Sequence, residues 1–271
     1  MDLDLGEKRN LFIIWSFVDV ADHDYIAARA CWRLGLLDQF HWFGLQAMEK
    51  YLKAILLYND CDTRKIGHDL TKGIQAVEAI PVLKWDFHQS LKGFLADLSQ
   101  RGQDRYFVKP HGTNGNELLQ LDRSVWHVRC YCVDPQSFDD SDGQNLENYV
   151  KTTQSDECRR SAYRFRLPSC ACAHLEEVLD TDRFRGQRSI LIWKNFFYGR
   201  RKKRHFKFTY SRSGKVPGHY FFPEIYPWVE SRVTLDKEVK KHFQQHANDL
   251  ARARVTACSF RVSPIQPKEQ Q

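Results

Sequence analysis

The sequence predicts a mainly α protein, in which an antiparallel bundle of four helices precedes a basic, aromatic-rich α+β extension. Apolar residues recur at helical spacing over residues 22–58, and the pattern returns twice before residue 135. An acidic, turn-rich stretch then separates this part from a strongly basic one. We therefore expect a helical domain over residues 1–135, an acidic linker over 136–156 and an extension over 157–271.

Four helical regions make up the expected bundle. Residues 22–58 fit two amphipathic helices with a break near residues 35–38. A third region covers residues 68–79 and resumes over 85–100 after a proline, and a fourth helix is expected at 117–132. Mostly short connections between such helices predict antiparallel neighbours.

The remaining segments give local predictions. The apolar run 11–18 is too short to cross a bilayer, so we expect a buried strand or a short helix there. A secretory signal is the alternative, although no small-residue cleavage site follows the run. In the extension we expect helices at 174–179 and 236–254 and strands at 189–193 and 205–210.

The positive charge is concentrated in one stretch of the chain. Lys plus Arg total 41 against 34 acidic residues, which gives a net charge of +7. Twelve of these basic residues and no acidic ones lie between Arg183 and Pro223. Such a stretch attracts phosphate backbones, anionic lipid or an acidic partner, and charge alone does not choose among them.

A polar stripe crosses one of the expected helices and carries Gln46, Glu49, Lys50 and Lys53. Taken alone, it indicates a solvated surface with an i,i+4 pair of Glu49 and Lys53, worth about 0.2–0.5 kcal/mol. It stands, however, in register with other elements. An Ala-rich helix precedes it, the segment His68-Asp69-Leu70 follows, and Arg105-Tyr106 comes after the next helix.

In their order and spacing these fragments resemble the HEPN domain, a helical family named for nucleotide binding in prokaryotes and higher eukaryotes. In that family a Gln-x-x-Glu-Lys-x-x-Lys-Ala helix precedes a His-Asp-Leu segment, and an Arg-Tyr pair follows a later helix. The resemblance covers roughly residues 21–135 and does not extend beyond the linker. Phe107 departs from the family pattern, which favours proline after Arg-Tyr.

The resemblance implies action on RNA or nucleotides, because many HEPN proteins are metal-independent endoribonucleases of toxin or phage-defence systems. Their signature is an Arg and a His with four to six residues between them. Arg105 and His111 fit it, although Pro110 prevents one continuous helix. In this interpretation the RNA 2′-OH attacks, His111 transfers a proton and Arg105 stabilises the phosphorane charge, with no metal or cofactor.

Two other pairs and a non-catalytic interpretation stay open. Arg123 and His127 lie on one helical face but are too close in sequence, and Arg200 and His205 lie inside a basic run. The competing function is an adaptor that binds nucleotide or protein through the helices. The resemblance also implies a homodimer and a nucleotidyltransferase-type antitoxin as partner.

The basic run consists of Arg200, Arg201, Lys202, Lys203 and Arg204 and is flanked by aromatic residues. Cations replace the counterions of a phosphate backbone, and rings stack on unpaired bases, so the run favours RNA or DNA contact. A solvated hairpin, a nuclear-localisation signal and acidic lipid are the alternatives.

The eight cysteines are too few for a disulfide scaffold, so we expect a cytoplasmic protein without membrane association. Two close pairs, Cys130 with Cys132 and Cys170 with Cys172, raise the question of zinc. Their spacing is not that of the usual zinc knuckle, and alternate residues of a helix point apart. Buried free thiols are therefore the favoured interpretation, and we expect no metal site.

Overall fold

The computed structural model describes residues 4–83, 85, 87–103, 115–135, 146–154 and 173–198, together with four helical positions at 240, 241, 245 and 248. Within these residues the protein is mainly helical, as expected. The described residues up to Tyr198 belong to one compact unit, and the four later positions belong to a second. The four helical positions fall inside the helix predicted at 236–254.

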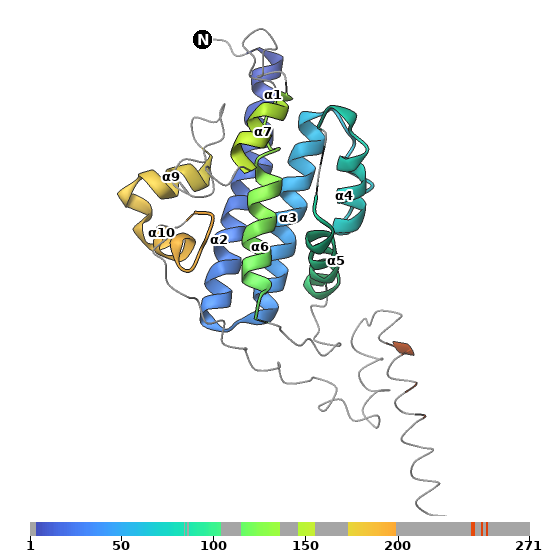
Figure 1. The fold of residues 1–271 in the computed structure, drawn as a ribbon, viewed down its shortest axis with the longest axis vertical. Coiled ribbons are helices and arrows are strands. Elements are labelled where there is room, and N and C mark those ends of the chain that lie inside the picture. The colour runs from blue at the N-terminus through green and yellow to red at the C-terminus, as the bar shows by residue number, and fades with distance from the viewer. Residues whose placement is uncertain are drawn as a thin grey trace, which may run out of the picture. The chain divides into compact units, whose positions relative to one another are not determined.

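A nearly continuous helical segment forms the N-terminal side of the first unit (Figure 1). Helix α1 (Leu5–Ile13) begins with a capping box, in which the side chains of Asp4 and Glu7 each accept from the other's backbone N–H. A π-helical turn (Ile14–Val18) joins it to α2 (Asp19–Leu34). The run 11–18 is thus helical, and no helix in the described part of the chain is both long and apolar enough to cross a bilayer.

The predicted break between the first two helices is confirmed. Helix α2 ends at Leu34, and Gly35 adopts the left-handed conformation with φ 75°. This conformation lets the Leu36 N–H donate to the Cys31 carbonyl at 2.8 Å, which closes the helix end. Helix α3 (Leu37–Tyr58) then starts in the opposite direction and packs against α2.

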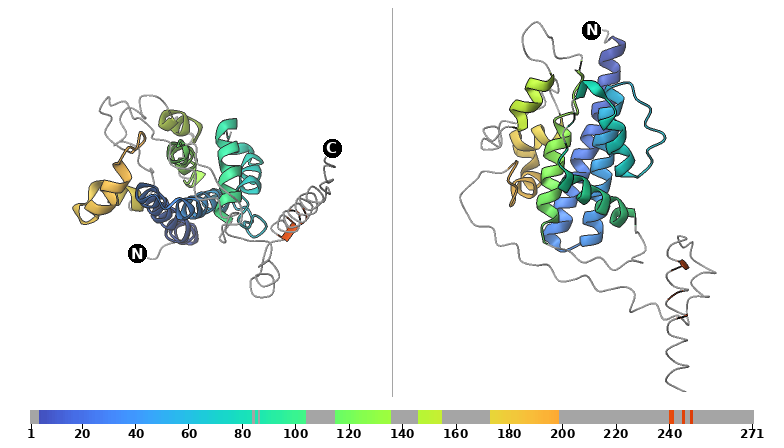
Figure 2. Two further views of the ribbon diagram at one scale, coloured as in Figure 1. Left: turned by 90° about the horizontal axis from the view of Figure 1, so that it is seen from below. Right: turned by 45° about the vertical axis from the view of Figure 1, so that its right-hand side comes forward.

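Helix α3 lies at the centre of the unit, with contacts to α1, α2 and three further helices (Figures 1 and 2). These are α4 (Leu70–Glu78), α5 (Gln89–Gln103) and α6 (Glu117–Arg129). They follow the predicted regions closely, with a short 3-10 turn at Pro81–Leu83 where the proline interrupts the pattern. The helices up to α6 are therefore predictable from the periodicity of the sequence.

The later segments differ from the predictions in two places, and the first is a helix where a strand was expected. Helix α9 (His174–Asp180) is as predicted, but residues 189–192, expected in a strand, belong to helix α10 (Arg185–Ile192). The strand prediction was wrong because alternation over five residues cannot be separated from one face of a short helix. Packing decides instead, since α10 buries Leu191 and contacts α2 and α9.

Residues 146–154, inside the predicted linker, form helix α7 with Leu146 and Val150 buried. Residues 173–198, placed in the predicted extension, lie in the same compact unit as α1 to α6. The domain limits at 135 and 156 stay a prediction. The strand predicted at 205–210 falls outside the described residues.

A fully buried guanidinium holds α9 against the helices before it. Arg129, at the end of α6, donates to both carboxylate oxygens of Asp22 on α2 and to both of Glu176 on α9, at 2.6–2.9 Å. Tyr51 Oη and the Leu175 N–H donate to the same Asp22 carboxylate at 2.5 and 2.9 Å. Burial alone would lower the pKa of Arg129, but the two carboxylates raise it well above its ordinary value.

A second buried guanidinium, that of Arg29, binds the end of α10. Arg29 and Asp122, both without solvent exposure, form an ion pair between α2 and α6, and Tyr25 Oη donates to the same carboxylate at 2.7 Å. The Arg29 side chain also donates to the carbonyls of Ile190 and Trp193 at the end of α10. These bonds fix residues 190–193 against α2.

We predict that Arg129→Met destabilises the protein by about 3–5 kcal/mol, because it leaves two buried carboxylates without their counter-charge. Urea unfolding followed by circular dichroism measures the change. Arg64→Met is the matched control, since Arg64 pairs with Asp62 on the surface, and its unfolding midpoint should barely move. Equal midpoints for the two variants would show that the buried network does not hold the fold.

Candidate functional site

Most of the polar side chains that carry the family resemblance lie along α3, and His68 joins them from the turn before α4. Glu49 is the centre of one group: Lys53 Nζ donates to its Oε1 at 2.6 Å, and His68 Nδ1 lies 2.6 Å from its Oε2. The i,i+4 pair predicted from the sequence is therefore confirmed. Glu49 is only 7% exposed, whereas the His68 side chain is 56% exposed, so the imidazole faces solvent.

A second group adjoins the first along the same helix. Lys50 Nζ donates to Asp24 Oδ2 at 2.7 Å and to Gln46 Oε1 at 3.1 Å. Asp24 comes from α2, and no pattern in the sequence links it to the motif. We call the side chains of Asp24, Gln46, Glu49, Lys50, Lys53 and His68 the motif cluster.

Asp69 has a different role from its neighbour His68. It is the N-cap residue of α4, where its side chain accepts from the backbone N–H groups of Thr71 and Lys72. Such a cap typically contributes about 1 kcal/mol to helix stability. The position of Asp69 in the motif is thus explained by folding and requires no ligand.

The residues predicted to be catalytic, Arg105 and His111, lie outside the described residues, but both ends of the segment 104–114 are described. Arg101 near the end of α5 donates to Glu117 Oε1 at 2.6 Å at the start of α6. His41 Nε2 on α3 lies 3.3 Å from the other carboxylate oxygen. This triad of Arg101, Glu117 and His41 joins α3, α5 and α6 at the two ends of the segment.

Close packing of α5 on α3 brings the triad together. A Cβ on Gly102 would lie 2.6 Å from the Cβ of Leu45 and 2.9 Å from the carbonyl oxygen of His41, so only glycine fits there. Burial would raise the pKa of Glu117, but the hydrogen bond and charge of His41, together with Arg101, hold it below its ordinary value. The Glu117 carboxylate is therefore ionised at neutral pH.

The structure also describes other residues that the sequence indicated, among them His127, Cys130 and Cys132. His127 is buried at 8% exposure with its ring against Phe87, so it offers no surface for RNA, which disfavours the pair with Arg123. Cys130 and Cys132 are buried reduced thiols, as favoured from the sequence. Within the described ranges no three His, Cys, Asp or Glu side chains form a metal-ligand group.

Several sequence predictions lie outside the described residues. They are Arg105, His111, Cys170, Cys172, His205 and the basic run Arg200, Arg201, Lys202, Lys203 and Arg204. The roles given to them above stay predictions.

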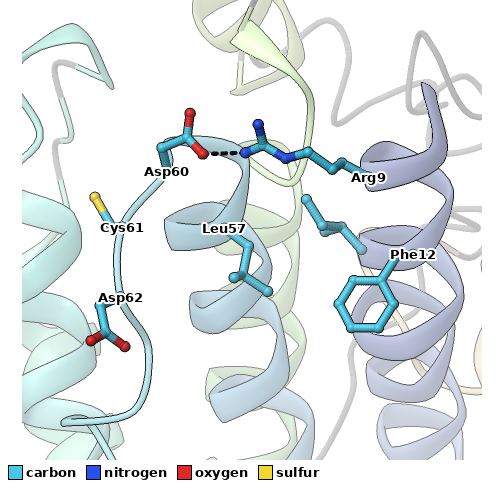
Figure 3. Close-up of a pocket in the computed structure, with 7 residues that line it drawn as sticks. Arg9, Phe12, Leu57, Asp60, Cys61 and Asp62 are labelled. Atoms are coloured by element: carbon cyan, nitrogen blue, oxygen red, sulfur yellow. Dashed lines mark hydrogen bonds and ion pairs between the residues drawn. The ribbon is translucent and has the colours of Figure 1, made fainter. Parts of the chain in front are cut away.

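A pocket of about 350 Å³ lies between α1 and the turn after α3, and its lining includes none of the motif residues. Figure 3 shows Arg9 reaching across to Asp60, with which it forms an ion pair, and Phe12 and Leu57 on its walls. Asp60 and Arg9 are both well exposed, so the pair lies at the open rim. The sequence pattern gave no indication of this pocket.

Comparison with known proteins adds nothing to this geometry: no family model, curated protein or solved structure matches the chain.

We predict that Glu117→Gln destabilises the protein most at neutral pH. Since the folded-state pKa of Glu117 is lowered, its stabilisation is present above the ordinary value of about 4.3 and is lost as pH falls through the folded value. Free energies of unfolding measured from pH 7 to pH 3 should therefore converge for wild type and variant on the acid side. The control Glu177→Gln, at an exposed position, should differ little from wild type throughout. A constant difference between wild type and Glu117→Gln would contradict this assignment.

Proposed function

We propose that this chain is a HEPN-like protein that acts on RNA or nucleotides. The most specific version of this proposal is metal-independent cleavage of RNA. The motif cluster supports the proposal. Residues separated in sequence by up to 44 positions, from Asp24 to His68, form adjacent hydrogen-bonded groups on α2, α3 and the turn before α4. A solvated stripe would account for Glu49 and Lys53, but it does not account for His68.

The chemistry of the cluster suits a phosphate ligand. Lys50 and Lys53 are partly exposed ammonium groups, and His68 adds an imidazole that gains charge when protonated. Glu49 and Asp24 hold these groups in place from less exposed positions. A phosphate at this surface would share Lys50 and Lys53 with the carboxylates that already pair with them.

Cleavage would rest on Arg105 and His111, which the family resemblance assigns. The RNA 2′-hydroxyl oxygen attacks the neighbouring phosphorus, and the 5′-oxygen of the next nucleotide leaves. His111 transfers the proton, and the guanidinium of Arg105 stabilises the charge on the phosphorane. The products are a 2′,3′-cyclic phosphate and a 5′-hydroxyl. The ion pair of Arg101 and Glu117 would hold the ends of this segment together.

A non-catalytic adaptor is the second candidate, and one observation favours it. Phe12 and Trp15, in α1 and the π-helical turn, are 57% and 61% exposed. Large exposed aromatic side chains near each other mark protein-binding surfaces. A second copy of the chain or a nucleotidyltransferase-type antitoxin would be the partner of such an adaptor.

We predict RNA cleavage in EDTA that depends on both assigned residues. Arg105→Ala and His111→Ala should each slow it by about 10²–10⁴-fold, since positioned proton transfer and charge stabilisation supply factors of that size. Mixed cellular RNA is the substrate, and the ends of the fragments are identified chemically.

Arg64→Ala and His88→Ala remove the same residue types from exposed positions and serve as controls. They should cleave at the wild-type rate. Cleavage that EDTA abolishes, or that survives both active-site substitutions, would remove the ribonuclease assignment. Binding of RNA without any cleavage would favour the non-catalytic adaptor over the ribonuclease.

We further predict that replacing the five cations of the basic run, Arg200 to Arg204, by Ser weakens RNA binding and flattens its salt dependence. Each phosphate that the protein no longer neutralises should reduce the slope of log K against log salt by about 0.7 for single strands. A control with the same charge change carries Ser at five exposed sites elsewhere, Lys8, Arg64, Lys65, Lys72 and Lys151. Equal slopes for the two variants would place the binding surface elsewhere.

A further inference from the structure

The turn that follows α10 is held rigidly although it lies at the surface. The buried Arg29 donates to the carbonyl of Trp193. Asn195, which is buried, donates through Nδ2 to Tyr25 Oη at 2.9 Å. Its Oδ1 accepts from the N–H groups of the two residues 197 and 198 at 2.9 and 3.1 Å. The position of Trp193 is thus fixed from inside the protein.

Two cations lie over the indole of Trp193. The guanidinium carbon of Arg33, from the end of α2, is 5.5 Å from the ring centroid, and Lys194 Nζ is 5.0 Å away. Both cationic residues are exposed, and Trp193 is partly exposed. We call Arg33, Trp193 and Lys194 the indole cluster.

The backbone at Lys194 is unusual. Its φ is 49°, a left-handed conformation that costs a residue other than glycine or asparagine on the order of 1 kcal/mol. The strain is maintained by the bonds on either side, from Arg29 to Trp193 and from Asn195 to Tyr25. Such strained residues are concentrated at functional sites.

Positive charge predominates in the stretch of sequence that carries Trp193. Within the described residues neither Arg33 nor Lys194 forms an ion pair with a carboxylate. Residues 183–198 contain four basic residues and no acidic one. A further cation and ring pair, Arg183 over Phe184 at 5.4 Å, lies in the same stretch.

We propose that the indole cluster binds single-stranded RNA, with phosphates on Arg33 and Lys194 and a base against Trp193. Aromatic rings flanked by cations fit nucleic acid because a base stacks on the ring while its phosphate meets the charge. Charges alone would suit an acidic protein or an anionic membrane as well, but a fixed ring beside cations adds the stacking surface that an unpaired base needs. The inference rests on the proposed function, because it names the contact through which this protein holds its RNA.

The test measures the affinity for a twelve-nucleotide 2′-O-methyl oligouridylate by fluorescence anisotropy at several salt concentrations. This probe lacks the attacking hydroxyl, so binding is measured whether or not the protein cleaves RNA. The variants are Arg33→Gln, Trp193→Leu and Lys194→Asn, where Asn tolerates the left-handed backbone. Lys8→Gln removes one exposed charge on α1 and is the control.

Arg33→Gln and Lys194→Asn should each flatten the slope of log K against log salt by about 0.7. Trp193→Leu should weaken binding by about tenfold at every salt concentration, because stacking is lost and no charge is removed. Lys8→Gln should match wild type. Thermal unfolding of each variant confirms that it is folded.

The outcomes separate the two proposals. Wild-type binding that all three variants retain, with slopes equal to that of Lys8→Gln, would overturn the indole cluster and leave the proposed function standing. A wild-type protein that binds no oligonucleotide at low salt would overturn the indole cluster and also the RNA form of the proposed function. Weakened binding in the variants of a protein that cleaves nothing would support the indole cluster and remove only the cleavage step.

Discussion

The buried guanidinium of Arg129 is the interaction on which the first compact unit depends. It neutralises Asp22 and Glu176 at once and brings together α2, α6 and α9. Removing ions from water is costly, and the cost is offset only when each polar atom finds a partner. Arg129 meets this condition, because three of its nitrogens donate to the two carboxylates.

This requirement makes the arrangement specific. An apolar core tolerates sliding of helices by small amounts, but a bidentate ion pair has one geometry. The Asp22 carboxylate also accepts from Tyr51 on α3, so the same charged group sets the register of four helices. Arg29 adds a similar constraint for α10, through Asp122 and the carbonyl of Trp193.

The sequence predicted the helices well because their apolar periodicity is long, as from residue 22 to residue 58. It also predicted that Gln46, Glu49, Lys50 and Lys53 share one helical surface. The strand expected at 189–193 was wrong, since too few residues were available to distinguish the two periods. The helix at 146–154 was missed because its composition is that of a linker.

The triad of Arg101, Glu117 and His41 could not be found from the sequence. Its members lie on three helices, and their proximity depends on the packing of Gly102 against α3. The buried networks did leave a signal. Asp22 and Arg29 on α2, and Asp122 and Arg129 on α6, each lie seven residues apart and so share a helical face with apolar neighbours.

Helix α2 connects the buried networks to both candidate surfaces. Asp22, Arg29 and Arg33 lie along one stripe of this helix, because 7 and 11 residues are close to whole numbers of turns. The first two are fully buried, and Arg33, one turn beyond Arg29, is exposed beside Trp193. Asp24 leaves the helix in another direction and meets Lys50 of the motif cluster. The ion pairs that fix the rotation of α2 about its axis therefore also determine where Asp24 and Arg33 face. The same buried charges thus position a residue of the motif cluster and a residue of the indole cluster.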